Sequence, residues 1–448
     1  MPSLLGRERF SEAAAVALGV GADGVMVIAF HSTGGLTRFA SSRIHQNTWR
    51  EDLEFRIVAV VDGTKTGVAS THSLADEAIR KAAEDAVAIA RLSPGDPGFP
   101  GLAPPASYPA KAGFDEATAD AAPADRAERV KRALAEFPAD MEGAGYVETV
   151  ADEVIVASTT GLRAYGTASR AGIGVMAMTA DSSGYTERLE RRLEDLDASA
   201  LAARAVDKAE RSRDPSALEP GAYTVILEPA AVSTIMQFLG YLGFGGKALL
   251  EGRSFMTGRI GQQLISDQIT IVDDALAQDA LGLPFDFEGV PTERVTLIDG
   301  GVARGVVWDR ATAAKAGATS TGHGLPPPNS YGPIPLNLRM VPGTSSVENM
   351  IASTDRGLLV TRFHYSNVVN EKETILTGMT RDGTFLIEEG RIARGVRNLR
   401  YTQNALDALT NVEAVGDKLE ISTELFFGGS RAPALKIRDF KFSSATTH

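Results

Sequence analysis

Residues able to carry out metal or nucleophilic chemistry are scarce in this sequence. It contains no cysteine, which excludes thiolate nucleophiles, thiolate–zinc centres, iron–sulfur clusters and disulfides. No two of its six histidines stand at the H-E-x-x-H spacing that places two metal ligands on one helix face. A metal site built from distant residues would draw on His323, His364, Asp273 and Asp274. Unclustered histidines, however, are more often hydrogen-bonded structural residues.

Two glycine-rich segments match phosphate-binding loops by letter but not by context. In segment 19–24, GVGADG, a helix is expected before the glycines and a strand after them, which reverses the order of a dinucleotide-binding turn. In segment 240–247, Tyr241 occupies a position that requires glycine, and Ala248 replaces the hydroxyl that would bind magnesium. A helix that ends in a glycine turn explains this second segment. No G-x-S-x-G elbow supports a serine hydrolase.

Length and composition indicate a globular protein of two large domains. The chain has 448 residues, of which 44% are hydrophobic and 23% charged. With 45 Lys and Arg against 57 Asp and Glu, the net charge is −12, which argues against nucleic acid or anionic lipid as the main partner. No apolar run approaches the roughly 20 residues of a membrane span. The first residues do not form a secretory signal, so a cytoplasmic location is expected.

Periodicity and turn residues predict alternating strands and helices in the first half. Helices are expected over 3–18, 73–91, 124–136 and 186–213. Strands are expected over 25–32, 36–40, 44–50, 55–61, 146–150, 154–158 and 173–178. Residues 92–123 contain seven prolines and predict an extended connection over a surface.

A composition change divides the chain into two predicted domains. Residues 1–213 form an N-terminal α/β domain, 214–221 a linker with Pro215, Pro220 and Gly221, and 222–448 a β-rich C-terminal domain. In the C-terminal domain, strands are expected over 223–227, 265–272, 295–299, 302–308, 357–363 and 383–388.

Several short runs in the second half occur together in a specific order. They are IVDD (271–274), FEGVPT (287–292), LIDGG (297–301), VPG (341–343), GLLVT (357–361), the stretch 377–390, NLR (398–400) and VEAVG (412–416). With TRFA (37–40) and IHQN (44–47) in the first half, this ensemble resembles the TldD/PmbA (TldE) family of peptidases. The resemblance implies an α+β fold of two domains, an N-terminal α/β sheet domain and a β-rich, barrel-like C-terminal domain.

The resemblance also implies what the zinc-motif positions should contain. Catalytic members of the TldD type carry H-E-x-x-x-H near the start of the second domain and a cysteine ligand near the C-terminus. Here Glu228 and Ser233 stand at the two histidines, Pro229 stands at the catalytic glutamate, and segment 424–429 has no cysteine. Zinc hydrolysis needs three protein ligands and a base, whereas proline offers no base and serine is a poor ligand. Pro229 suits instead the first position of a helix.

The chain therefore resembles the TldE/PmbA-type subunit that lacks the zinc motif. That resemblance implies no catalytic residue, no metal and no cofactor in this chain, with zinc expected in a TldD-like homologous partner. The two chains of such a heterodimer enclose a passage for an unfolded or modified peptide, and neither nucleic acid nor membrane is expected as a partner. Backbone pairing with an extended peptide would give affinity with little sequence preference.

Six residues are candidates for peptide or partner contacts. Arg362, His364 and Tyr365 follow a predicted strand and combine charge, aromatic surface and a titratable ring. Arg339 and Arg381 are candidates for gripping a peptide carboxylate. His323 lies between glycines and three prolines, in a loop predicted to act as a lid or partner contact.

Two alternatives remain open at this stage, because a fold does not fix a function. The first is a zinc-independent enzyme of natural-product biosynthesis that uses His364, Tyr365, Asp273, Asp274 and Glu228. The second is a structural or regulatory homodimer. Co-expression with a homologous chain that carries H-E-x-x-x-H distinguishes these alternatives from the non-zinc subunit.

Overall fold

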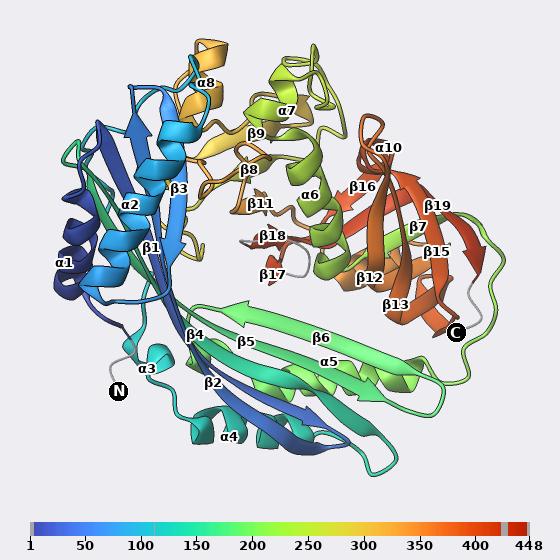
Figure 1. The fold of residues 1–448 in the computed structure, drawn as a ribbon. Coiled ribbons are helices and arrows are strands. Elements are labelled where there is room, and N and C mark those ends of the chain that lie inside the picture. Colours follow the sequence, from blue (N-terminus) through green and yellow to red (C-terminus); the bar gives the residue numbers. More distant parts are fainter. Residues whose placement is uncertain (1–3, 112, 423–428, 446–448) are drawn as a thin grey trace.

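A computed structural model describes residues 4–111, 113–422 and 429–445 and shows an α+β fold, as the sequence predicts (Figure 1). The first half builds one antiparallel sheet of long strands in the order β3-β2-β1-β4-β5-β6. Their bounds are β1 Gly24–Ala40, β2 Arg43–Val61, β3 Lys65–Thr71, β4 Glu142–Ser158, β5 Arg163–Met178 and β6 Ser183–Glu190.

The first two strands are longer than the sequence predicts. The expected breaks at 33–35 and 51–54 are absent, because β1 stays paired with β2 on one side and β4 on the other along this whole length. Gly34 and Gly35 are therefore extended strand residues, not turn residues. The chain reverses instead at Ser41 and Ser42, which both have positive φ (46° and 55°), as a tight hairpin turn requires.

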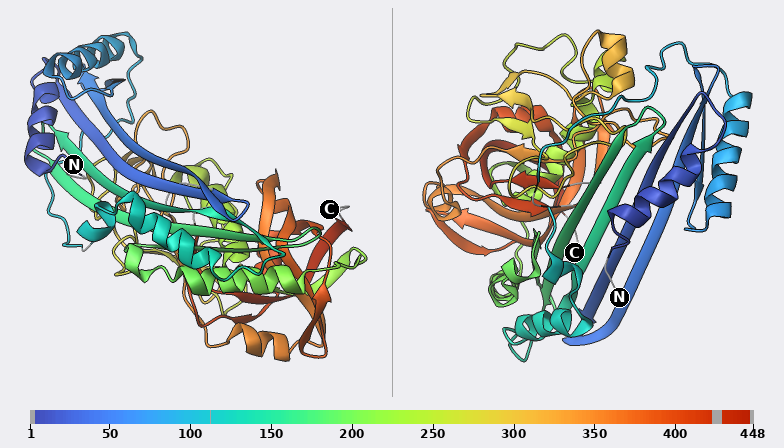
Figure 2. Two further views of the ribbon diagram at one scale, coloured as in Figure 1. Left: turned by 90° about the horizontal axis from the view of Figure 1, so that it is seen from below. Right: turned by 90° about the vertical axis from the view of Figure 1, so that its left-hand side faces the viewer.

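Helices cover one face of this sheet in two groups. Helices α1 Arg7–Leu18 and α2 Asp76–Leu92 pack over one end, while α3 Glu116–Ala119, α4 Pro123–Leu134 and α5 Ala198–Arg211 lie at the other. Strand β1 divides its side chains between the two faces: Val25 and Val27 meet the helices, whereas Met26 and Ile28 meet Phe285 of the second half. Figure 2 shows the C-terminal elements on the face opposite α1 and α2.

The predicted helix 186–213 is wrong in its first part. Residues 186–190 belong to β6 and pair with β5, and a 3₁₀ turn, Leu193–Asp195, follows. Helix α5 begins only where the Asp197 side chain accepts a hydrogen bond from Ala200 N–H. The density of charge indicated a helix here, but the charged residues Glu187, Arg188 and Glu190 are the partly buried positions of an edge strand in which Thr186 and Leu189 are buried.

The proline-rich connection contains the short helix α3 and contacts loops of the second half. Tyr108 Oη donates to the carbonyl of Gly289 at 2.8 Å. Arg310 donates to the carbonyls of Pro100 and Gly101, and Lys111 donates to two carbonyls of segment 275–282. Burial lowers the pKa of Lys111 to about 8. These contacts tie the connection to C-terminal loops.

The second half contains two further sheets. One has the order β10-β9-β8-β11-β18-β17. In the other, the pairings run β12-β7-β19-β15-β13 and return to β12, which closes a ring, with β14 added to β13 and β16 to β19. Helix α6 packs in the large core between them. The predicted strand 302–308 is shorter than expected, since β10 covers only Val302–Ala303, and 265–272 contributes only the start of β8.

The remaining bounds are β7 Gly221–Leu227, α6 Pro229–Gly243, α7 Gly246–Leu250, β8 Ile271–Asp273, β9 Val295–Asp299, α8 Arg310–Ala316, β11 Leu338–Met340, α9 Val347–Ala352, β12 Arg356–Asn370, β13 Ile375–Glu388, β14 Arg391–Gly395, β15 Leu399–Asn404, α10 Ala405–Thr410, β16 Val412–Val415, β17 Glu420–Ser422, β18 Ser430–Ala432 and β19 Leu435–Ala445. No helix within the described residues is long and apolar enough to cross a membrane.

Helix α5 lies directly against a glycine of strand β6. A Cβ atom at Gly184 would stand 2.1 Å from the carbonyl oxygen of Ala205 and 2.5 Å from the backbone nitrogen of Ala209. We therefore expect Gly184→Ala to lower the free energy of unfolding by about 1–3 kcal/mol, because helix and strand must separate. Urea denaturation monitored by circular dichroism measures this. Gly21→Ala, where a Cβ would meet nothing within 4 Å, is the matched control; equal losses in both variants would contradict the packing argument.

Candidate functional site

The zinc-motif positions lie where strand β7 passes into helix α6. Strand β7 pairs in parallel with β12 up to Leu227, and Glu228 N–H donates to the carbonyl of Val360 at 3.0 Å. Glu228 is extended and caps α6, and Pro229 occupies the first helical position, where its missing N–H costs nothing. Nearly every later side chain of α6 is buried. The helix start expected from the sequence is therefore present.

Glu228 is bound by an ammonium group from the first half of the chain. Its Oε2 lies 2.5 Å from Nζ of Lys208 in α5, and the two side chains are only 14% and 10% exposed. Lys208 Nζ also donates to the carbonyl of Tyr185 in β6 at 3.3 Å. One lysine thus joins α5, β6 and the start of α6. Because water is largely excluded, this pair is stronger than a surface ion pair and costly to break.

Ser233 belongs to a buried hydroxyl cluster one turn further along α6. Its Oγ lies 2.5 Å from Oγ of Ser430, to which Gln237 Nε2 also donates at 3.0 Å. The cluster joins α6 to strand β18. The predicted third-ligand segment 424–429 lies outside the described residues except for Gly429.

A small pocket opens in front of Glu228 between the two halves of the molecule. Its lining comes from β6, α5, the start of α6, β12 and β17, and consists of Tyr185, Thr186, Glu187, Arg204, Lys208, Glu228, Pro229, Ala230, Thr361, Glu420, Ile421 and Ser422. Glu420 is paired with Arg188 at 2.8 Å and with Arg204 at 3.1 Å. The charges facing the pocket are thus largely neutralised by one another.

The donors at this site do not fit zinc. Glu228 is already paired with the ammonium group of Lys208, Pro229 has no proton-accepting side chain, and the Ser233 hydroxyl is hydrogen-bonded to the hydroxyl of Ser430. Among residues 4–111, 113–422 and 429–445, no group of three or more His, Cys, Asp or Glu side chains is placed to hold a metal. The alternative metal site of His323, His364, Asp273 and Asp274 is therefore not formed in this part of the chain.

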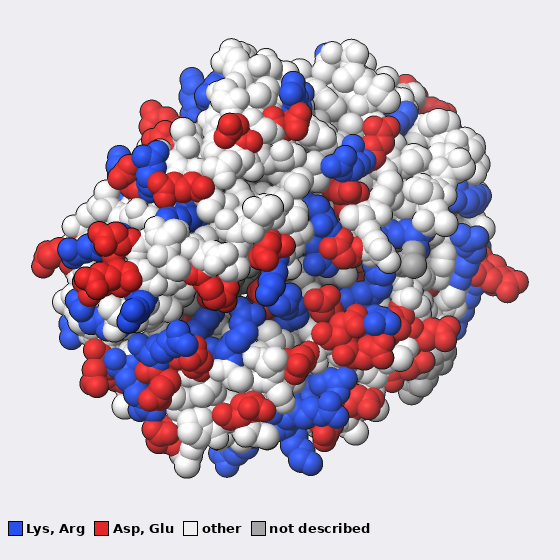
Figure 3. All heavy atoms as spheres, turned by 180° about the vertical axis from the view of Figure 1, so that it is seen from behind, with Lys and Arg blue, Asp and Glu red and all other residues white. Residues whose placement is uncertain are grey.

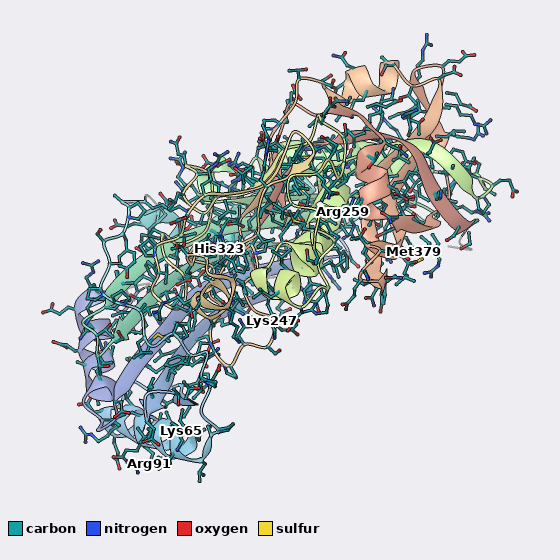
Figure 4. All side chains as sticks on the ribbon, turned by 90° about the horizontal axis from the view of Figure 1, so that it is seen from above. Lys65, Arg91, Lys247, Arg259, His323 and Met379 are labelled. Carbon is teal, nitrogen blue, oxygen red and sulfur yellow. The ribbon has the colours of Figure 1, made fainter. Side chains whose placement is uncertain are left out.

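His323 is buried and holds loops together. Its Nε2 lies 2.9 Å from Oδ1 of Asp273, its Nδ1 lies 2.9 Å from the Thr321 carbonyl, and the residue is only 5% exposed. Figure 4 shows it in the interior, where the first sheet meets the C-terminal elements. Asp274 pairs separately with Arg294 at 3.4 Å. This burial favours a structural role for His323, and its role as a lid or partner contact stays a prediction.

Four of the predicted contact residues do come together, on the β12–β13 hairpin. In the backbone pairing of the two strands, Arg362 lies opposite Arg381 and His364 lies opposite Met379. Arg362 Nη2 lies 2.5 Å from Asp382, and its guanidinium stacks 3.9 Å from the ring centroid of Tyr185 in β6. Asp382 also accepts a hydrogen bond from Ser183 of β6 at 2.7 Å. Arg362 therefore fastens the hairpin to the first sheet.

Further along β12, Tyr365 projects outward in a strained conformation. It is 79% exposed and has φ +53°, which is unusual for an aromatic residue, and its ring meets that of His364 edge-on at 5.1 Å. Burial, and then Arg381 and Arg362, lower the pKa of His364. Glu228 and Asp274 are engaged in ion pairs elsewhere and Asp273 is hydrogen-bonded to His323, so the five residues of the enzyme alternative do not form one site.

Arg339 lies apart from this hairpin, on strand β11. It and Arg431 of β18 both pair with Asp279 and line a second small pocket that reaches Ile421 of β17.

Acidic and basic side chains are interspersed on the face shown in Figure 3, so that face has no stripe of positive charge that would bind nucleic acid. Sequence analysis missed Lys208, Arg204 and Asp382. Each is separated along the chain from the residue it contacts, which is Glu228 for Lys208, Glu420 for Arg204 and Arg362 for Asp382.

Comparison with known proteins places this chain in a family. Three family models match in order: "PmbA/TldA metallopeptidase domain 1" over residues 25–90, the "central domain" over 104–213 and the "C-terminal domain" over 220–444. Together the three models cover most of the chain in the order of the family's domains. The chain belongs to the PmbA/TldD metallopeptidase family.

Individual relatives agree with this assignment. A Haemophilus influenzae protein named "Metalloprotease PmbA homolog" is 27% identical over 85% of this chain and 84% of its own length. "Metalloprotease TldD homolog" of the same organism is 29% identical over 44% of this chain, and the alignment spans only 42% of that relative. The crystal structure of TldE from Thermococcus kodakarensis has the same fold, with TM-score 0.87 and 22% identity over 97% of this chain and 100% of that chain.

The Lys208–Glu228 pair predicts a measurable coupling. We expect Lys208→Met to lower the free energy of unfolding by about 3 kcal/mol, because Glu228 is left with a poorly hydrated, unpaired charge. The double variant Lys208→Met, Glu228→Gln should lose much less than the sum of the two single losses. Denaturant unfolding of all four proteins gives the coupling energy. Additive losses would show that the two side chains do not depend on each other.

His364 should titrate below the ordinary histidine value of 6.5. The pKa of His364 is lower in the folded chain than in the unfolded chain, so the unfolded chain binds more protons between these two pKa values. The contribution of His364 to the free energy of unfolding is therefore complete above pH 6.5 and is lost as the pH falls from 6.5 towards the folded pKa. Arg381→Gln should raise the pKa in an NMR titration, since one repelling charge is removed. Arg391→Gln on β14 is the control, because Arg391 is not among the charges that act on His364. An unchanged His364 pKa in Arg381→Gln would contradict this cause.

Proposed function

We propose that this chain is the non-zinc subunit of a TldD/TldE-like heterodimeric metallopeptidase, in which a homologous partner supplies the zinc. One observation carries the proposal: the position of the metal-binding motif contains a carboxylate held by an ammonium ion, a proline and a serine. Family membership supports the peptidase context. Zinc, partner and peptide all belong to the proposal.

The physical reason is the source of the positive charge at the start of α6, which is a metal ion in a zinc site and the Lys208 ammonium group in this chain. A zinc site needs three ligands and a base for the bound water. The ammonium group of Lys208 supplies a positive charge beside Glu228 but, unlike a zinc ion, it cannot coordinate ligands. It therefore holds α6 to β6 without a metal. The architecture of a catalytic site is kept in this way, while its hydrolytic chemistry is assigned to the partner.

We propose an extended, unfolded or modified peptide as the substrate that the complex accommodates. The pocket before Glu228 lies between β6 and β17, the last strands in their sheets among the described residues. Strand edges expose backbone donors and acceptors that pair with an extended chain and not with a folded domain. The exposed Tyr365 and neighbouring His364 are proposed contacts for the peptide or the partner. A cytoplasmic location remains part of this proposal.

Co-expression with a homologous chain that carries H-E-x-x-x-H tests the proposal. We expect a stable complex with one zinc per pair of chains, which cleaves an unfolded peptide but not a folded domain and loses activity on chelation. A partner with its first motif histidine replaced by alanine is the control, and should bind this chain without cleaving. Peptide cleavage by this chain alone, with tightly held zinc, would overturn the proposal, as would failure to associate with any zinc-bearing homologue.

A further inference from the structure

A fully buried carboxylate lies on the helix-covered face of the first sheet, outside the site described above. Glu153 of β4 is 0% exposed, and His31, which lies opposite it in the pairing of β1 with β4, is 2% exposed. Tyr165 of β5 donates its hydroxyl to Glu153 Oε2 at 2.8 Å, and Nδ1 of His31 lies 2.8 Å from Oε1. A carboxylate that has lost its water needs a counter-charge as well as hydrogen bonds.

His31 supplies that counter-charge, because its ring lies between two carboxylates. Its Nε2 is 3.1 Å from Oε1 of Glu51 in β2, while its Nδ1 faces Glu153. A neutral imidazole donates from only one nitrogen, whereas the imidazolium donates from both. Burial lowers the pKa of His31, but the hydrogen bonds and charges of Glu153 and Glu51 outweigh burial and raise the pKa above 6.5. The geometry therefore calls for the protonated ring.

The same carboxylate holds the N-terminal segment, residues 4–6. The backbone N–H of Leu5 donates to Oε1 of Glu153, and that of Gly6 donates to Oε2 at 3.2 Å. Helix α1 begins at the next residue, Arg7, whose guanidinium lies 5.2 Å from the ring centroid of Tyr165. The N-terminal end of the chain lies between α1 and α3 in Figure 1. Of the four donors to Glu153, two belong to sheet strands and two to this segment.

We propose that His31 is a pH-dependent switch for the N-terminal segment, which stays docked on Glu153 while the ring is charged and is released when the ring becomes neutral. Without the imidazolium, Glu153 is a buried carboxylate that has lost its counter-charge. His31 and Tyr165 are fixed by strand pairing, so the departure of residues 4–6 is the smallest movement that lets water reach Glu153. Glu51 is 59% exposed and turns into water without such a movement.

The direction of the pH dependence follows from the pKa shifts. Because the pKa of His31 is raised, docking is complete below pH 6.5 and is lost as the pH rises through the folded pKa. Burial raises the pKa of Glu153, but the hydrogen bonds from His31, Leu5 and Tyr165 outweigh it and lower the pKa below 4.5, so Glu153 stays charged in this range. Burial and then Glu153 raise the pKa of Tyr165, against the opposing charge of Arg7, so the phenol stays a donor.

Amide hydrogen exchange of the purified full chain tests the switch, with the His31 ring titrated by NMR in the same samples. After correction for the intrinsic exchange rate at each pH, the opening constant of Leu5 and Gly6 should rise about tenfold per pH unit between 6.5 and the folded pKa, because opening releases one proton. It should be level above the folded pKa. An opening constant that does not change while His31 titrates would overturn the proposal.

Two variants distinguish the charge on His31 from the hydrogen bonds around it. In His31→Gln no ring titrates, so the segment should open readily and to the same extent at every pH. Glu153→Gln keeps an acceptor oxygen but leaves no buried charge, so its opening constant should also be independent of pH. His72→Gln, which replaces an exposed histidine of the same half, is the matched control and should keep the wild-type profile.

Circular dichroism checks that each of these variants is folded. A wild-type pH profile in His31→Gln or in Glu153→Gln would contradict the switch, and the wild-type measurement decides alone if a variant does not fold. The inference goes beyond the proposed function and does not depend on it, since it concerns the isolated chain and involves neither zinc nor peptide.

Discussion

The contact between Lys208 and Glu228 is the constraint on which the arrangement of this site depends. It joins a helix that covers the first sheet, the carbonyl of an edge strand and the residue that caps the helix of the C-terminal core. At 2.5 Å and with little exposure, the pair loses much of its solvation, and only mutual neutralisation makes its burial tolerable. The ammonium therefore does structurally what a bound cation would do, without the Lewis acidity that hydrolysis requires.

Other contacts across the same junction reinforce this arrangement. Arg362 of the C-terminal hairpin stacks on Tyr185 and pairs with Asp382, which in turn accepts from Ser183. On the other side of the pocket, Glu420 pairs with Arg188 and Arg204. The first half contributes the cations Lys208, Arg188 and Arg204, and the second half contributes the carboxylates Glu228 and Glu420 with which they pair. The pocket is consequently shaped by a closed network and not by free ligands.

Much of this could be predicted from the sequence, and the failures have identifiable causes. The α+β class and the start of α6 followed from periodicity, Pro229 and the resemblance to a known family. Strand lengths were underestimated, because Gly34 and Gly35 indicate a turn unless neighbouring strands hold them extended. Thr186 to Glu190 indicated a helix by charge spacing, although pairing with β5 makes it a strand. Lys208 gave no signal at all, since its partner Glu228 lies twenty residues away, beyond strand β7.

The most direct test of the central claim is the position of zinc in a crystal of this chain with a zinc-bearing homologue, measured by anomalous scattering at the zinc absorption edge. The account predicts a single peak within the homologous chain, and near Glu228 only the density of the Lys208 ammonium. A peak at coordination distance from Glu228 and Ser233 would contradict it, because the metal would then be held by the very residues described here as unable to bind it.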